Sequence, residues 1–358
     1  MNFLVPLSEI GNYLLVSLLM GHVALLFVPE DYKPSIRISK RVLLLATLGV
    51  YIFSFGPVAQ TISYFSESVG LTVAAYSVLT DFQVGRAWII IGFMSMFLWI
   101  ALMVNSSKYI QALLLTIIVL AVGYSSHVAS LEFWTGLFAH SIHFFMVTLW
   151  VGILIHAAWF SNEFHKWDRF LQWFTPLAVG SIIVIFISGF TLMIFVVNPK
   201  EYADAWVLPY GQMLLLKHIS IVPVLAFALL NGVLAKKASR SATFNPRPWL
   251  KGETILLVIT FYFTSILGSL SPPHEVEFTV KSEGASKWVE WLFGKDILTT
   301  LNIEWQANLT AWFLLIISVL FLLLIFISFK KVKPAAGVFF ALSFIFTMYF
   351  GLMLSLAV

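Results

Sequence analysis

The run LTAWFLLIISVLFLLLIFISF, residues 309–329, carries no charged side chain and is long enough to cross a lipid bilayer as one helix. A hydrocarbon core about 30 Å thick requires roughly 20 apolar residues in helical conformation, because lipid offers the backbone no hydrogen-bond partner. Comparable runs lie at residues 8–28, 42–65, 84–104, 110–126, 136–160, 173–197, 211–235, 254–270 and 335–357. The sequence therefore predicts an all-α polytopic integral membrane helix bundle of about 10 transmembrane helices, within a range of roughly 8 to 10.

The composition excludes a water-soluble domain. Of the 358 residues, 60% are apolar and 11% are charged, whereas about 25% of the residues in an ordinary soluble domain are charged. The absence of cysteine excludes disulfides, thiolate metal sites and iron–sulfur clusters. No nucleotide-binding loop or acidic phosphorylation motif is present, and we expect no enzymatic activity.

The basic residues predict the orientation of the chain, because Lys and Arg are retained on the cytoplasmic side of a membrane. Fifteen of the 21 Lys and Arg residues fall in alternate loops. They are Lys33, Arg37, Lys40, Arg41, Lys108, Lys166, Arg169, Lys236, Lys237, Arg240, Arg247, Lys251, Lys330, Lys331 and Lys333. Both termini are therefore expected outside, and the formal charge of +4 reflects topology and not a nucleic-acid partner.

The loops are short except for residues 271–308, which are expected on the outer side. Within this loop, Trp288 and Trp291 stand at helical spacing among charged residues, a pattern typical of a segment lying in the membrane interface. No linker separates two soluble parts, so residues 1–358 are interpreted as a single membrane domain.

The histidines are the most informative polar residues, because an ionisable group inside a span is costly and usually functional. His140 and His143 are three residues apart, so their imidazoles share one helix face and can converge on one ion. Met146 continues that face, and His127 and His274 are expected near the same outer surface. Imidazole with thioether suits copper, whereas zinc gains little from a thioether. The plainer alternative is that these histidines form hydrogen bonds between helices and that Met146 only packs.

Other intramembrane polar residues are weaker candidates. His22, with Met20, lies in the first span and could be a second station on a path inward, although a single histidine serves equally well as an interhelical hydrogen-bond partner. His218 and Lys217 lie in the seventh span. The Lys217 side chain would either reach outward to water or pair with a carboxylate such as Asp204 or Glu201.

A rival interpretation is a redox protein that holds haem or copper. His143 and His156 are 13 residues apart, about 20 Å along a helix, as in proteins that stack two haems. Such a site requires a facing helix with a matching histidine pair, and no other span supplies one. A dihaem site is therefore disfavoured, while one haem between two histidines stays open.

Four stretches resemble the membrane core of the copper resistance protein D (CopD) family. They are Ser126-His127-Val128-Ala129; His140-x-x-His143 with Leu149-Trp150-Val151-Gly152; Ser188-Gly189-Phe190 with Tyr210-Gly211 to Lys217; and Ser269-Leu270-Ser271-Pro272-Pro273-His274. Together they cover residues 126–274, and Tyr210-Gly211 followed by Lys217 is the most specific of them. Ser126 stands where the family usually has Gly, and the fused copper-binding β-sandwich domain of some members is not expected here.

The resemblance implies a multi-pass protein of the bacterial plasma membrane that takes up copper. The expected copper ligands are His127, His140, His143, Met146 and His274, with a path through His22, Met20, His218, Lys217 and Tyr210. Glu132, Glu275 and Glu277 would form an acidic vestibule that concentrates cations. The expected partners are the copper ion, the lipid bilayer and a separate extracytoplasmic copper chaperone as donor. The copper oxidation state and the direction of transport stay open, and the alternatives are a membrane redox protein or a copper-binding assembly or sensing partner.

Overall fold

The computed structural model describes residues 4–161, 166–234, 236, 245–273, 275–299, 303–306, 308–331 and 333–357. The chain divides into two compact units, Met1–Leu192 with Ala238–Arg247 and Met193–Lys237 with Pro248–Val358. Both units are helical, and the described strands are two residues long each. Nine described helices are long and apolar enough to span a membrane, and α6 is a shorter apolar helix of 17 residues. The protein is therefore an all-α polytopic membrane bundle.

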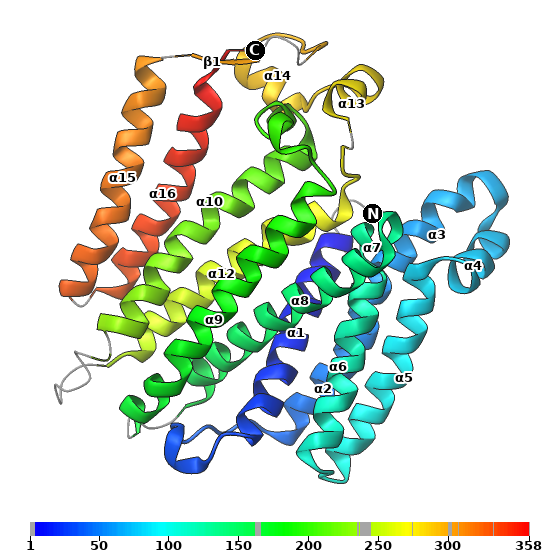
Figure 1. The fold of residues 1–358 in the computed structure, drawn as a ribbon, viewed down its shortest axis with the longest axis vertical. Helices are drawn as coiled ribbons and strands as arrows, with labels where there is room; N and C mark the ends of the chain where they lie inside the picture. The colour runs from blue at the N-terminus through cyan, green and yellow to red at the C-terminus, as the bar shows by residue number, and fades with distance from the viewer. Residues whose placement is uncertain are drawn as a thin grey trace. The chain divides into compact units, whose positions relative to one another are not determined.

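The first unit contains most of the helices (Figure 1). In chain order they are α1 (Leu4–Leu26), η1 (Glu30–Tyr32), α2 (Lys40–Phe53), α3 (Phe55–Val69), α4 (Leu71–Thr80), α5 (Gln83–Met103), α6 (Lys108–Tyr124), α7 (His127–Leu131), α8 (Phe133–Ile155), the π-helix η2 (His156–Phe160) and α9 (Trp167–Ile194). Helix α1 packs against α2 and α8, and α6 packs against α5 and α8. Because α1 and α8 lie in direct contact, polar residues on their facing sides can meet.

The second unit carries the remaining helices. They are η3 (Pro199–Glu201), η4 (Asp204–Val207), α10 (Pro209–Leu229), the π-helix η5 (Leu230–Leu234), α12 (Arg247–Ser269), α13 (Val276–Glu283), α14 (Lys287–Phe293), α15 (Leu309–Lys330) and α16 (Pro334–Leu354). Helix α16 packs against α10 and α15. The short strands β1 (Glu304–Trp305) and β2 (Leu356–Ala357) pair antiparallel and fasten the chain end to the segment before α15.

Two predicted spans differ from the helices observed. The second span is interrupted at Ser54, where α2 ends and α3 begins. Pro57 lacks the amide hydrogen that would bond to the carbonyl of Phe53, which explains the interruption. The eighth span begins at Arg247 and not at residue 254, because the fold accommodates Glu253 inside the helix beside Asn231. A prediction from hydropathy alone places the end of the span next to such a carboxylate.

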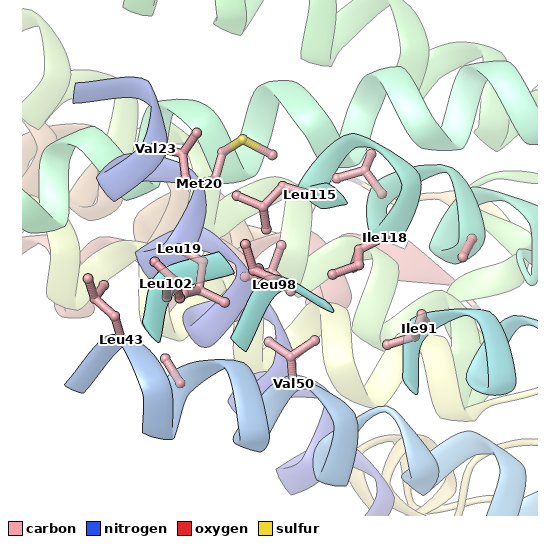
Figure 2. Close-up of a cluster of buried hydrophobic side chains, with 14 of the residues drawn as sticks. Leu19, Met20, Val23, Leu43, Val50, Ile91, Leu98, Leu102, Leu115 and Ile118 are labelled. Carbon is pink, nitrogen blue, oxygen red and sulfur yellow. The ribbon is translucent and has the colours of Figure 1, made fainter. Parts of the chain in front are cut away.

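An apolar cluster forms the core of the first unit (Figure 2). It joins Leu19 and Met20 of α1 to Leu98 of α5 and Leu115 of α6. At one end of this unit, basic side chains hold the loops: Lys33 pairs with Glu30 at 2.8 Å, and Lys40 donates to the carbonyl oxygen of Met103 at 2.5 Å. The Lys40 bond joins the start of α2 to the end of α5.

Candidate functional site

The corner between α7 and α8 carries His127. The Ser126 hydroxyl accepts a hydrogen bond from the amide of Ala129 and caps α7, so this small residue has a structural use at its position. Gly136 of α8 lies directly against the Ala129 backbone, where a Cβ would collide. This contact folds α7 back onto the first turns of α8, and the His127 side chain is exposed there.

His143 and Met146 project from α8 toward α9. The Nδ1–H of His143 lies 3.1 Å from the Ile185 carbonyl oxygen and 3.1 Å from the Ser188 hydroxyl oxygen, both of which can accept its hydrogen bond. A Cβ at Gly189 would lie 3.2 Å from the same imidazole, so a small residue makes room for the ring. The Ser181 hydroxyl lies 3.9 Å from the Met146 sulfur.

The predicted outer ligands that the structure describes lie on α7 and α8. His140 is half-buried one turn before His143 on the same helix. Among the residues that the structure describes, no three His, Asp or Glu side chains converge closely enough to hold a metal ion. His274, the remaining predicted ligand, lies outside the described residues.

The structure places His22 and Met20 on different sides of α1. Met20 is buried in the apolar cluster shown in Figure 2. The imidazole of His22 faces that of His156, with 6.4 Å between the ring centres and 30° between the ring planes. Two residues turn about 200° around a helix, which explains why the thioether and the imidazole diverge. The thioether of Met20 thus serves packing, and the neighbour of His22 is a second histidine.

His156 is a functional candidate that reasoning from the sequence left unpaired. Its side chain is 1% exposed, and its Nδ1–H donates to the carbonyl oxygen of Gly152 at 2.8 Å. Its Nε2 is buried and has no hydrogen-bond partner among the described atoms. His156 also begins the π-helix η2, a local widening that is frequent at functional sites. The sequence feature that could have indicated this pair is a glycine near each histidine. Gly21 directly precedes His22, and Gly152 lies one turn before His156.

The second unit contains the other predicted path residues. The Tyr202 hydroxyl donates to Nδ1 of His218 at 2.6 Å. Burial raises the pKa of Tyr202, which lies outside the spans, to about 12, so the phenol keeps its proton at neutral pH. The ion pairs in the described part of the chain do not include Lys217. The Lys217 side chain therefore does not pair with Asp204 or Glu201, which was one of the two alternatives from the sequence. Tyr210 lies half-buried in the first turn of α10.

One of the predicted vestibule carboxylates belongs to an acidic group in the second unit. Glu277 accepts a hydrogen bond from the Thr299 hydroxyl at 2.7 Å and pairs with Lys281 at 2.9 Å. Burial, and then the neighbouring charges of Glu201 and Glu277, raise the pKa of Asp204. Glu201 and Glu277 thus act on Asp204 as neighbouring negative charges. Glu275, at the start of α13, and Glu132, between α7 and α8, are exposed.

Two buried polar groups of the second unit were not anticipated. The Glu253 carboxylate is 2% exposed and accepts a hydrogen bond from the Asn231 side-chain amide at 2.7 Å. The Tyr349 hydroxyl donates to the Gln212 side-chain oxygen and accepts from the Trp288 indole N–H at 2.9 Å. Each group satisfies a polar side chain that would otherwise be costly inside a membrane.

Comparison with known families identifies one region of the chain. The model of the family described as copper resistance protein D matches residues 168–267, from the first turn of α9 to the last turn of α12. Ser188, Gly189 and the stretch from Tyr210 to Lys217 fall within this match, whereas His127, His140 and His143 precede it. No curated protein and no solved structure matches the chain. Residues 168–267 of this multi-pass membrane protein are thus similar to the copper resistance protein D family.

Proposed function

We propose that the protein carries copper inward across the bacterial plasma membrane, starting from an outer-facing site of His127, His140, His143 and Met146, with His274 as a further ligand. The observation that carries this proposal is the contact of His143 with Ser188 and Gly189. The histidine lies outside the residues matched by the family model, but the two residues that position its ring lie inside them. This contact links the copper-related region to the histidine pair of α8.

The route inward starts in the first unit. His22 belongs to this unit, together with all the described ligands of the proposed outer site. Tyr210, Lys217 and His218 belong to the second unit and form a separate set of path candidates. Copper entering the first unit would leave the outer ligands on α7 and α8 and reach the imidazole of His22 on α1.

Charge favours inward movement of a cation. The exposed carboxylates of Glu132 and Glu275, and the acidic group around Glu277, would raise the local cation concentration. A negative-inside membrane potential favours inward movement of one charge by about 2.3 kcal/mol per 100 mV. Transport of a monovalent ion would therefore need no nucleotide hydrolysis. A separate extracytoplasmic copper chaperone would be the donor.

A vesicle experiment tests the proposal. The full-length protein is reconstituted into vesicles with a negative-inside potential, and copper entering the lumen is measured. His140→Ala with His143→Ala should abolish uptake and remove the copper that the outer site binds. His165→Ala is the matched control, because it removes a histidine from a loop expected in the cytoplasm. Undiminished copper binding by the double variant would overturn the site. Binding without uptake by the unaltered protein would make it a binding or sensing partner.

The redox alternative is tested by an absorption spectrum of the purified protein. Two stacked haems would require His143 and His156 to face one common helix. Instead, the His143 ring contacts α9 and the His156 ring faces α1. This arrangement disfavours two stacked haems. The transport proposal expects no Soret band, and a stoichiometric one would contradict it.

A further inference from the structure

We infer that His22 and His156 form a second metal site, in which two imidazoles hold one monovalent copper ion between α1 and α8. The choice of copper as the ion rests on the proposed transport function, but the geometry of the pair does not. His22 lies in the last turns of α1 and His156 directly follows α8. With the predicted orientation, this site lies at the cytoplasmic end of the first unit, opposite the proposed outer ligands.

The ring separation matches a bridging ion. An imidazole nitrogen lies about 1.1 Å from its ring centre, and a metal–imidazole bond is about 2.0 Å long, so two imidazoles on opposite sides of one ion have centres about 6.2 Å apart. The observed separation of the His22 and His156 ring centres is 6.4 Å. A direct hydrogen bond between the rings would bring the centres to about 5.1 Å. The separation of the two ring centres is therefore compatible with one bridging ion and too long for a direct hydrogen bond between the rings.

The hydrogen bonding of His156 prepares Nε2 as a ligand. Metal-binding histidines usually donate the other ring N–H to a carbonyl or carboxylate, which fixes the tautomer and leaves a lone pair for the metal. The Nδ1–H of His156 makes this bond to the Gly152 carbonyl oxygen at 2.8 Å. The remaining Nε2 is buried and unpartnered among the described atoms, a costly arrangement unless another group occupies the space beside it.

Glycine packing sets the position of the two rings. Gly21 and Gly152 touch through their backbones, so no side chain separates α1 from α8 next to the histidines. Beside the pair, Ala157 is fully buried and the Phe160 ring centre lies 5.6 Å from that of His156. Such close backbone contact favours a single ion over a macrocycle as the occupant.

The charges around the pair favour a monovalent ion. Lys33 lies near enough for its charge to act on His22, and it pairs with the exposed Glu30. No described group of three His, Asp or Glu ligands exists here to neutralise a divalent ion. Coulomb repulsion from Lys33 is twice as large for a divalent ion as for a monovalent one. Cu(I) is stable with two ligands in line, whereas Zn²⁺ almost always takes four.

The test is an anaerobic titration of the full-length protein with Cu(I) against a coloured Cu(I) chelator. The background is His140→Ala with His143→Ala, so that the outer site is absent. This protein should still bind one equivalent of Cu(I), and X-ray absorption should show two nitrogen ligands and no sulfur. Adding His22→Ala should remove that equivalent. His165→Ala is the matched control, because it removes a histidine from a loop expected in the cytoplasm and should leave the equivalent in place.

The outcomes separate this inference from the proposed function. The inner site is overturned if the double variant binds no Cu(I), or if its Cu(I) has sulfur or more than two nitrogen ligands. The absence of Cu(I) binding is the result expected if only a water molecule bridges the two imidazoles. If the unaltered protein and the double variant bind equally, the outer site fails, while the effect of His22→Ala still decides the inner one. Should His22→Ala not fold, as judged by circular dichroism, the X-ray absorption result on the double variant decides.

Discussion

Replacing Gly21 by alanine tests the contact between α1 and α8. An added Cβ would lie 2.8 Å from the Cα of Gly152 and closer still to its carbonyl carbon and oxygen. All of these are backbone atoms, so no side-chain rotation can relieve the collision. Because ordinary contact begins at 3.4 Å, the two helices must move apart by more than about 0.6 Å.

The cost of this movement can be estimated. Overpacking a close-packed interior costs typically about 1–3 kcal/mol, and for TM helices small residues are what allow such close approach. A loss of about 2 kcal/mol lowers the melting temperature of a unit of this size by about 4–8 °C. The same displacement would lengthen the separation of the His22 and His156 rings beyond the span that one ion can bridge. Gly21→Ala should therefore lose the inner Cu(I) equivalent as well as stability.

The assay is thermal unfolding of the purified protein in detergent, followed by circular dichroism, together with the Cu(I) titration. Gly180→Ala is the matched control, since no atom lies within 4 Å of the position where its Cβ would be. That helical glycine should gain about 0.5–1 kcal/mol on replacement by alanine. If Gly21→Ala unfolds at the temperature of the unaltered protein, α1 and α8 do not pack through these glycines and the reasoning fails.

Three further outcomes are expected. Asn231→Leu leaves the buried Glu253 carboxylate without its 2.7 Å hydrogen bond and should cost about 1–3 kcal/mol in thermal unfolding, whereas Asn231→Gln should cost less. Trp288→Phe removes the 2.9 Å donor to Tyr349 and should cost about 1 kcal/mol by the same measurement, and no change would exclude this bond from the stability of the second unit. Asp204 has a raised pKa in the folded state, so its charged form destabilises that state above this pKa and has no effect below the ordinary value of 3.8. Asp204→Asn should therefore raise the melting temperature at pH 7, with a gain that vanishes as the pH falls below 3.8; an equal gain at both pH values would contradict this cause.

The sequence predicts the helices well because each span must satisfy its own backbone in lipid, which imposes a long apolar run. The prediction of a span boundary fails where a side chain of another helix stabilises a polar residue inside the span. Glu253 looks like the boundary of a span until Asn231 of another helix supplies its hydrogen bond. The interruption at Ser54 was readable from Pro57, because proline removes a helical hydrogen bond wherever it occurs.

The candidate sites were less predictable. The spacing of His140 and His143 puts both imidazoles on one face of α8, since that relation is local to a helix. The contact of His143 with Ser188, and that of His22 with His156, join residues from different helices. The rotation of a helix separates Met20 from His22, and this could have been predicted from the sequence. The partner of a histidine on another helix cannot be predicted from a local sequence pattern.

The sequence by itself determined that this chain is a multi-pass helical membrane protein, its basic residues predict the orientation, and its motifs resemble the copper resistance protein D family, whose model matches residues 168–267. These properties follow from hydropathy and charge, which act residue by residue. Only the tertiary structure decided which imidazoles face each other. That choice depends on Gly21 meeting Gly152, because two backbones can touch only where neither residue carries a side chain.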